Sequence, residues 1–267
     1  MLKKRLIPKL LIKKNPNNNP ILVTSFQFDK FKLVGSPVSQ AKIFEAQHAD
    51  QLILLNIDNF ELLNSSPIMS LLNEFSKKIF MPLTFGGGIK KIETIELLLK
   101  NGADKICVNS VALKNQKFLS EASEIFGKQC ITVSIDFKFN GKFYEVFENH
   151  GKNPTGQNII DWSKKVEQLG AGEVILTDIN LDGTAKGLNI EISKIISDIL
   201  KIPVIISGGC GKASDFIECF NNSNVQGIAA GNFFSNYNFF SPLSQIPPLI
   251  ALLSHKATAR SPSVTCC

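Results

Sequence analysis

Short, nearly continuous apolar runs alternate along this chain with longer segments whose apolar residues recur every three or four positions. A short apolar run is typical of a parallel strand buried on both faces, and the longer spacing is typical of a helix packed on a sheet. The pattern predicts eight strands, at residues 5–12, 51–57, 81–85, 105–109, 131–137, 173–178, 203–206 and 227–230. It predicts helices between them, at residues 37–47, 67–78, 91–100, 116–126, 158–169, 190–200 and 212–220.

Eight alternating units predict an α/β fold of the (β/α)8 TIM-barrel type, with an open, doubly wound sheet as the alternative. The stretch 13–20, rich in Asn and Lys, predicts a loop, and residues 21–28 predict a hairpin arm. A second hairpin is predicted between residues 137 and 155, around Asn140-Gly141. No linker divides residues 1–253, which indicates one domain, and the aperiodic tail at 254–267 is expected to be disordered.

Two of the predicted strands end in consecutive glycines, at Gly86–Gly88 and at Gly208–Gly209. Each glycine turn leads into a predicted helix, so backbone N–H groups and a helix N-terminus face the same point. Such turns bind anions, phosphate above all. Because the two turns stand about 120 residues apart, they indicate a barrel built as a two-fold repeat of half-barrels, with one phosphate site in each half.

Composition narrows the class of partner. The formal net charge is +6, but the lysines are scattered, which favours small anionic molecules over nucleic acid. No apolar segment reaches about 18 residues, so neither a signal peptide nor a membrane span is expected, and a cytoplasmic location is predicted. The six cysteines lack metal-ligand spacing and are expected to be reduced thiols; neither a metal nor another cofactor is predicted.

Polar residues at the strand ends are the candidates for chemistry, because a barrel of this kind places its active site at the carboxyl ends of its strands. Asp136 ends the fifth predicted strand and is a candidate general acid or base, with a structural cap as the alternative. Arg5, Lys105 and Glu173 each begin a strand and therefore belong at the opposite mouth. From the residues alone a stabilising ring of charges is favoured there, and a gate for a small molecule is the alternative.

Several motifs, in this order along residues 1–253, resemble the cyclase subunit of imidazole glycerol phosphate synthase. They are Arg5-Leu6-Ile7-Pro8, Gly86-Gly87-Gly88-Ile89, Gly102-Ala103-Asp104-Lys105, Val133-Ser134-Ile135-Asp136, Gly170-Ala171-Gly172-Glu173, Asp182-Gly183-Thr184 and Ser207-Gly208-Gly209-Cys210-Gly211-Lys212. The resemblance implies a (β/α)8 barrel that works with a class I glutamine amidotransferase. That glutaminase docks on the amino-terminal face and releases ammonia, which crosses the barrel to a bis-phosphorylated ribulosyl aminoimidazole carboxamide.

The resemblance also assigns roles by position. It implies a catalytic role for Asp136 and an ammonia gate at Arg5, Gln51, Lys105 and Glu173, where the family has an acid in place of Gln51. The substrate's phosphates are expected at a set of glycines and polar residues on the carboxyl side. These are Gly88, Asn109, Thr177, Asp182, Gly183, Ser207, Gly208, Gly209 and Gly231.

The chain departs from the family pattern where the family has its other catalytic aspartate, since Leu11 stands there. Asn56, Thr24-Ser25 and Gly231 are further departures. This combination resembles second-copy relatives in surface-polysaccharide gene clusters, which work with their own glutaminase and a sugar amidotransferase to make acetamidino sugars. Two alternatives stay open: an authentic histidine-pathway cyclase, using Asp136 alone or another group such as Lys9 or Asp178, and a non-catalytic scaffold that only activates a glutaminase.

Overall fold

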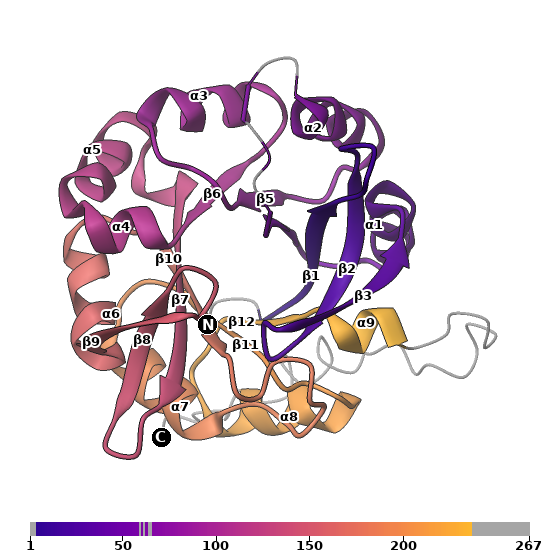
Figure 1. The fold of residues 1–267 in the computed structure, drawn as a ribbon. Coiled ribbons are helices and arrows are strands. Elements are labelled where there is room, and N and C mark those ends of the chain that lie inside the picture. Colours follow the sequence, from indigo (N-terminus) through magenta and orange to yellow (C-terminus); the bar gives the residue numbers. More distant parts are fainter. Residues whose placement is uncertain (1–3, 59, 61, 64–65, 237–267) are drawn as a thin grey trace, which may run out of the picture.

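Eight parallel strands form a closed ring in the computed structural model, which describes residues 4–58, 60, 62–63 and 66–236. In ring order they are β1 (Arg5–Lys14), β4 (Leu52–Asn56), β5 (Leu83–Gly86), β6 (Lys105–Val108), β7 (Ile131–Phe139), β10 (Glu173–Asp178), β11 (Val204–Ser207) and β12 (Gly227–Ala230). The ring closes because β12 pairs with β1 and β7 pairs with β10 (Figure 1). The predicted barrel is confirmed, and the open sheet is excluded.

Helices surround the ring of strands (Figure 1). They are α1 (Pro37–Ala46), α2 (Pro67–Lys78), α3 (Ile92–Lys100), α4 (Ser110–Lys114), α5 (Gln116–Phe126), α6 (Ile159–Gln168), α7 (Ile190–Ile199), α8 (Ala213–Asn222) and α9 (Asn232–Asn236), with a 3-10 turn at Lys128–Cys130. Five of them begin after a Ser or Asn whose side chain accepts a backbone N–H of the first turn. This capping fixes where those helices start.

Two hairpins extend the barrel strands and correct parts of the prediction. β2 (Pro20–Phe26) and β3 (Lys30–Gly35) follow β1, whereas β8 (Tyr144–Glu148) and β9 (Asn153–Asn158) follow β7. The predicted loop at 13–20 is shorter than expected, because β1 runs on to Lys14 as it pairs with β2. β3 was not predicted because nearly all of its residues are exposed, and α4 was not predicted because it is only five residues long.

The core has two parts, which follow from the alternation of side chains along each barrel strand. One set packs outward against the helices and includes Leu6, Leu10 and Ile12 of β1. A smaller set fills the lumen, and it consists of Ile7, Ile53, Cys107, Ile175, Ile205 and Ala229, with Leu55 packed against them. Since Ile7 faces inward, the odd-numbered residues of β1 line the lumen.

The two glycine turns occupy equivalent places, after β5 and β11, which are the third and seventh strands of the barrel. Gly87 and Gly208 both have φ of +96°, a conformation that favours glycine. A Cβ on Gly87 would lie 1.9 Å from the carbonyl oxygen of Asn56, and one on Gly208 would lie 2.5 Å from that of Asp178. Each turn therefore packs on the end of the preceding barrel strand, as the predicted half-barrel repeat requires.

The extent of the domain, 1–253, stays a prediction, and the predicted tail at 254–267 lies outside the described residues. Among the helices of the described part, none is long and apolar enough to cross a membrane.

Candidate active site

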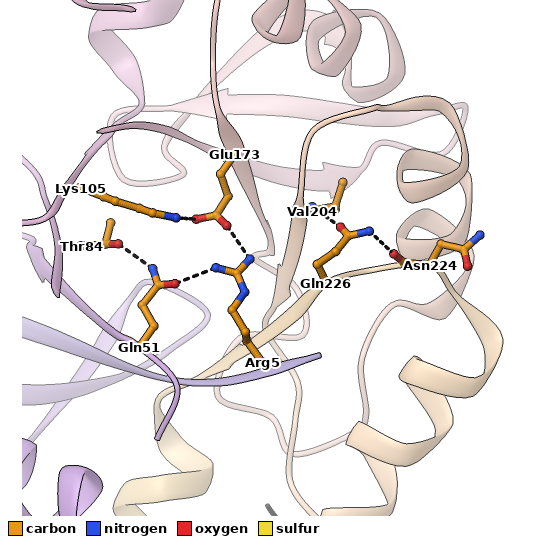
Figure 2. A network of polar contacts seen from close by, with 8 residues as sticks. All are labelled: Arg5, Gln51, Thr84, Lys105, Glu173, Val204, Asn224 and Gln226. Carbon is orange, nitrogen blue, oxygen red and sulfur yellow. Dashed lines mark hydrogen bonds and ion pairs between the residues drawn. The ribbon is translucent and has the colours of Figure 1, made fainter. Parts of the chain in front are cut away.

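Four side chains from the starts of barrel strands meet at the amino-terminal mouth (Figure 2). Arg5 donates to Oε1 of Glu173 at 2.5 Å and to Oε1 of Gln51 at 2.8 Å. Lys105 Nζ lies 3.2 Å from the other carboxylate oxygen of Glu173. Gln51 in turn donates to Thr84 Oγ1 at 2.7 Å. We call Arg5, Gln51, Lys105 and Glu173 the ionic network.

The ionic network carries two cations around one buried carboxylate. The Glu173 side chain is 3% exposed, against 18% for Arg5 and 26% for Lys105. Because the amide of Gln51 is neutral, the four side chains have a formal charge of +1. The structure thus brings together the four residues predicted for the gate, and their role as a gate stays a prediction.

An apolar layer fills the lumen above the ionic network. It is the inner set that contains Ile7, Ile53 and Cys107. Burial, together with nearby carboxylates, raises the pKa of the Cys107 thiol to about 12, so this sulfur stays neutral. Moving an ion from water into such a layer costs a large desolvation free energy, whereas moving a small neutral molecule costs much less.

Asp136 lies at the carboxyl-terminal mouth, on the inner face of β7, and is 8% exposed. Its carboxylate accepts hydrogen bonds from Asn109 Nδ2 at 2.8 Å and from Ser134 Oγ at 3.4 Å. Burial raises its pKa to about 6; the charge of Asp182 adds to this rise, and the charge of Lys9 opposes it. A carboxyl group that titrates near neutral pH can both take up and release a proton in turnover.

The loop after β10 is tied to the first hairpin next to this carboxyl group. Asp182 is buried and accepts a 2.5 Å hydrogen bond from Ser25 Oγ. Asn232 Nδ2 donates to the carbonyl oxygens of Ser25 and Gly183. A Cβ on Gly183 would lie 2.2 Å from the Ser25 carbonyl oxygen, so glycine permits this close approach. These contacts fix the position of Asp182 near Asp136, and its predicted phosphate contact stays a prediction.

Unpartnered polar atoms mark both glycine turns. Asn56 Nδ2 and Ser207 Oγ are buried and have no hydrogen-bond partner within the described residues. Asn56 Nδ2 lies 3.4 Å from where a Cβ on Gly88 would stand, at the first turn. Ser207 ends β11 directly before Gly208. A buried donor without a partner is costly, and an anion bound at each turn would satisfy it.

The remaining predicted phosphate residues lie at the same mouth. Thr177 stands in register with Asp136 on one side and with Ser207 on the other. A Cβ on Gly209 would lie 2.0 Å from the Gly187 carbonyl oxygen, and one on Gly231 would lie 3.1 Å from that of Lys9. Their position is compatible with phosphate binding, which stays a prediction.

Asp178, an alternative base in the sequence analysis, faces away from the lumen, because Ile175 and Thr177 take the inner positions of β10. Its carboxylate accepts from the backbone N–H groups of Asn180 and Leu181 and from Asn189 Nδ2. Asp178 therefore anchors the loop after β10.

Sequence reasoning did not assign Ser25, Thr84 or Ser134, which only their partners reveal. Lys9 was weighed only as an alternative, and it proves to be a buried lysine inside the barrel, 6% exposed. Strand alternation from Ile7 was the signal that could have placed it.

Within the described part of the chain, no group of three or more His, Cys, Asp or Glu residues is placed to hold a metal ion.

Comparison with known proteins gives a consistent result. The profile of the family described as "Histidine biosynthesis protein" matches residues 9–239. The chain is 41% identical over 247 residues to a protein of Methanococcus vannielii, covering 84% of this chain and 88% of that one. It is 40% identical over 237 residues to a protein of Staphylococcus carnosus, covering 87% and 91%. Both relatives are named imidazole glycerol phosphate synthase subunit HisF.

Proposed function

The chain belongs to the histidine biosynthesis family as a HisF-like cyclase subunit of imidazole glycerol phosphate synthase, and from this premise we propose that its barrel carries ammonia from a glutaminase partner to a phosphorylated substrate. One observation carries the proposal: the ionic network, the apolar layer and Asp136, whose pKa is raised, follow one another along a single lumen.

The amino-terminal mouth suits the receipt of ammonia. The net positive charge of the ionic network repels ammonium, and the apolar layer above it favours neutral ammonia over any ion. The glutaminase, a class I glutamine amidotransferase subunit, would cover this face and complete a heterodimer. Phe80, three residues before β5, is 85% exposed and offers an apolar contact for that partner.

The carboxyl-terminal mouth suits a substrate with a phosphate at each end. The two glycine turns lie four strands apart around the ring, and Asp136 stands between them on β7. The cyclase substrate of the family, a bis-phosphorylated ribulosyl aminoimidazole carboxamide, has this form. Ammonia adds to it, and cyclisation with cleavage gives imidazole glycerol phosphate and an aminoimidazole carboxamide ribotide. Asp136 would move protons in these steps.

Steady-state conversion of that substrate with ammonium chloride tests the proposal, since ammonium salt replaces the glutaminase. We expect formation of imidazole glycerol phosphate by the protein alone, and glutamine-dependent formation once a glutaminase partner is added. A barrel that stimulates the glutaminase but forms no aminated product with either nitrogen source would instead be the non-catalytic scaffold.

The pH dependence of the ammonium-dependent rate should follow the titration of the Asp136 carboxyl group. Because burial raises its pKa to about 6, the carboxylate that accepts a proton is lost as the pH falls through 6. We expect kcat/KM, calculated for free ammonia, to fall tenfold per pH unit below that point. An acid limb near pH 4 would show that the group in control is an ordinary exposed carboxyl.

Ser207→Ala tests the second phosphate site. The unpartnered hydroxyl of Ser207 is expected to donate to a phosphate oxygen, and a hydrogen bond to a charged group contributes about 1.5–3 kcal/mol. We expect KM for the phosphorylated substrate to rise about tenfold or more with kcat little changed. Ser163→Ala is the matched control, because the Ser163 hydroxyl is also buried and unpartnered but belongs to α6. Equal KM values for the two variants would contradict the assignment.

A second candidate function rests on Leu11, which cannot transfer a proton. In this version the barrel is a paralogue that passes ammonia to a sugar amidotransferase for acetamidino-sugar and lipopolysaccharide synthesis. The two versions differ in a simple experiment. The paralogue should fail to complement a histidine-requiring cyclase deletion and should support amination of a nucleotide-linked sugar; growth of the complemented strain without histidine would overturn it.

A further inference from the structure

A lysine is buried inside the barrel, on the strand that lacks the family's aspartate. Lys9 is 6% exposed and lies between two other inward positions of β1, Ile7 below and Leu11 above. Lysine is among the residues that are least often buried, and its charge in a protein interior requires a compensating partner. The apolar layer below Lys9 offers no such partner.

The compensating charge comes from the far side of the lumen. In ring order β7 is the fourth strand from β1, so the two strands face each other across an eight-stranded barrel. Lys9, Cys107 of β6 and Asp136 of β7 all take inward positions of their strands, and the charge of Lys9 acts on both of the other groups. Glu173, the next carboxylate below, is already bonded to Arg5 and Lys105.

The stem of Lys9 also has the reach to compensate for Leu11. Two residues along a strand span about 6.7 Å, which is comparable to the length of the four-carbon lysine stem. An amine that starts at position 9 can therefore reach the level at which a side chain of residue 11 would act. We propose that Lys9 is the second catalytic group of this barrel and forms an acid–base pair with Asp136 across the lumen.

The pair has a defined task, which rests on the proposed use of ammonia at this mouth. As the nitrogen of ammonia bonds to a carbonyl carbon of the substrate, Asp136 accepts a proton from that nitrogen, and Lys9 donates one to the carbonyl oxygen. The product is a carbinolamine, in which the former carbonyl carbon carries a hydroxyl and an amino group. A neutral carboxyl group and a neutral amine are left on the protein. Proton transfer from Asp136 to Lys9 restores both groups for the next turnover.

Lys9→Met keeps the approximate length of the side chain and removes the amino group that would donate a proton. With ammonium chloride and the phosphorylated cyclase substrate, we expect kcat to fall by about 10²-fold or more. Lys9→Arg should also lose most of the rate, because a guanidinium does not release its proton in proteins. Lys14→Met is the matched control: it removes the same side chain from the same strand, but from the outer face, where Lys14 lies over the ring of Phe60. Lys9→Met or Lys9→Arg with the activity of the Lys14→Met control would overturn the proposal.

A measurement without substrate separates this proposal from the proposed function. The charged groups that act on Asp136 are Lys9, which lowers its pKa, and Asp182, which raises it; Asn109, Ser134 and Cys107 are its neutral neighbours. Carbon-13 titration of the Asp136 carboxyl group should therefore give a higher pKa in Lys9→Met than in the unaltered protein, and an unchanged one in Lys9→Arg. If the unaltered protein converts no substrate, the proposed function fails while this titration still reports on the pair. A titration that is the same in Lys9→Met would overturn the pair itself.

Discussion

Asp136→Asn is expected to lower the ammonium-dependent turnover number by about 10²–10⁴-fold, the usual contribution of a positioned acid–base group. Asparagine fills the same volume and keeps one oxygen that can accept from Asn109, while its NH2 group can donate to the Ser134 hydroxyl, but it cannot take up a proton. KM for the phosphorylated substrate should change little, because the two glycine turns stay intact. Steady-state kinetics with ammonium chloride measures both quantities.

Asp178→Asn is the control for this experiment. Asp178 is also a buried aspartate with a raised pKa at the end of a barrel strand, and its strand pairs with that of Asp136. Its carboxylate faces outward and bonds the loop that precedes α7. We expect Asp178→Asn to reduce the melting temperature and to leave kcat within a few-fold. A larger loss of kcat at Asp178 than at Asp136 would show that the base has been assigned to the wrong strand.

The barrel was predictable because its signal is local. A parallel strand buried on both faces reads as a short apolar run, so Glu173–Asp178 and Gly227–Ala230 were placed with the observed bounds. β3 lacks this signal, since pairing with β2 and not burial holds it in place. The bounds of β1 also depend on that hairpin, which carries the strand two residues past the predicted end.

The sequence predicted those site residues whose position follows from a single strand. Asp136, Thr177 and Ser207 end their strands, and the topology of a barrel brings strand ends together. The proposed pair could not be predicted in this way, because Lys9 and Asp136 come from opposite strands and share no local pattern. The sequence shows a lysine within an apolar run, and only closure of the ring places this lysine and Asp136 on facing strands.

The interior of the barrel combines groups that oppose stability. A buried lysine, a carboxyl group with a raised pKa and the unpartnered hydroxyl of Ser207 all lie above an apolar layer that could have continued to the mouth. Each of them has a cost in folding free energy. Their concentration at one mouth, where the glycine turns also open, supports a functional origin for this cost.

Glu173→Gln is expected to have the largest effect on stability. The change leaves Arg5 and Lys105 facing each other without the buried carboxylate that now accepts from both. Removing one partner of a buried ion pair costs about 3–5 kcal/mol of unfolding free energy, and each kcal/mol lowers the melting temperature by about 2–4 °C. Thermal and denaturant unfolding measure this loss. Glutamine-dependent synthesis should fall further than ammonium-dependent synthesis, because ammonium salt can supply ammonia from the open mouth.

Two further variants separate a loss of charge balance from the loss of any ion pair. Glu96→Gln removes an exposed pair with Lys100 on α3, and it should cost at most about 1 kcal/mol. Gln51→Glu combined with Glu173→Gln returns one carboxylate to the ionic network, 2.8 Å from the guanidinium at the present amide oxygen. We expect this double variant to regain part of the lost stability, because Arg5 again has an anionic partner. If Glu173→Gln is as stable as Glu96→Gln, and glutamine supports synthesis as well as ammonium does, the ionic network neither holds the mouth together nor controls entry.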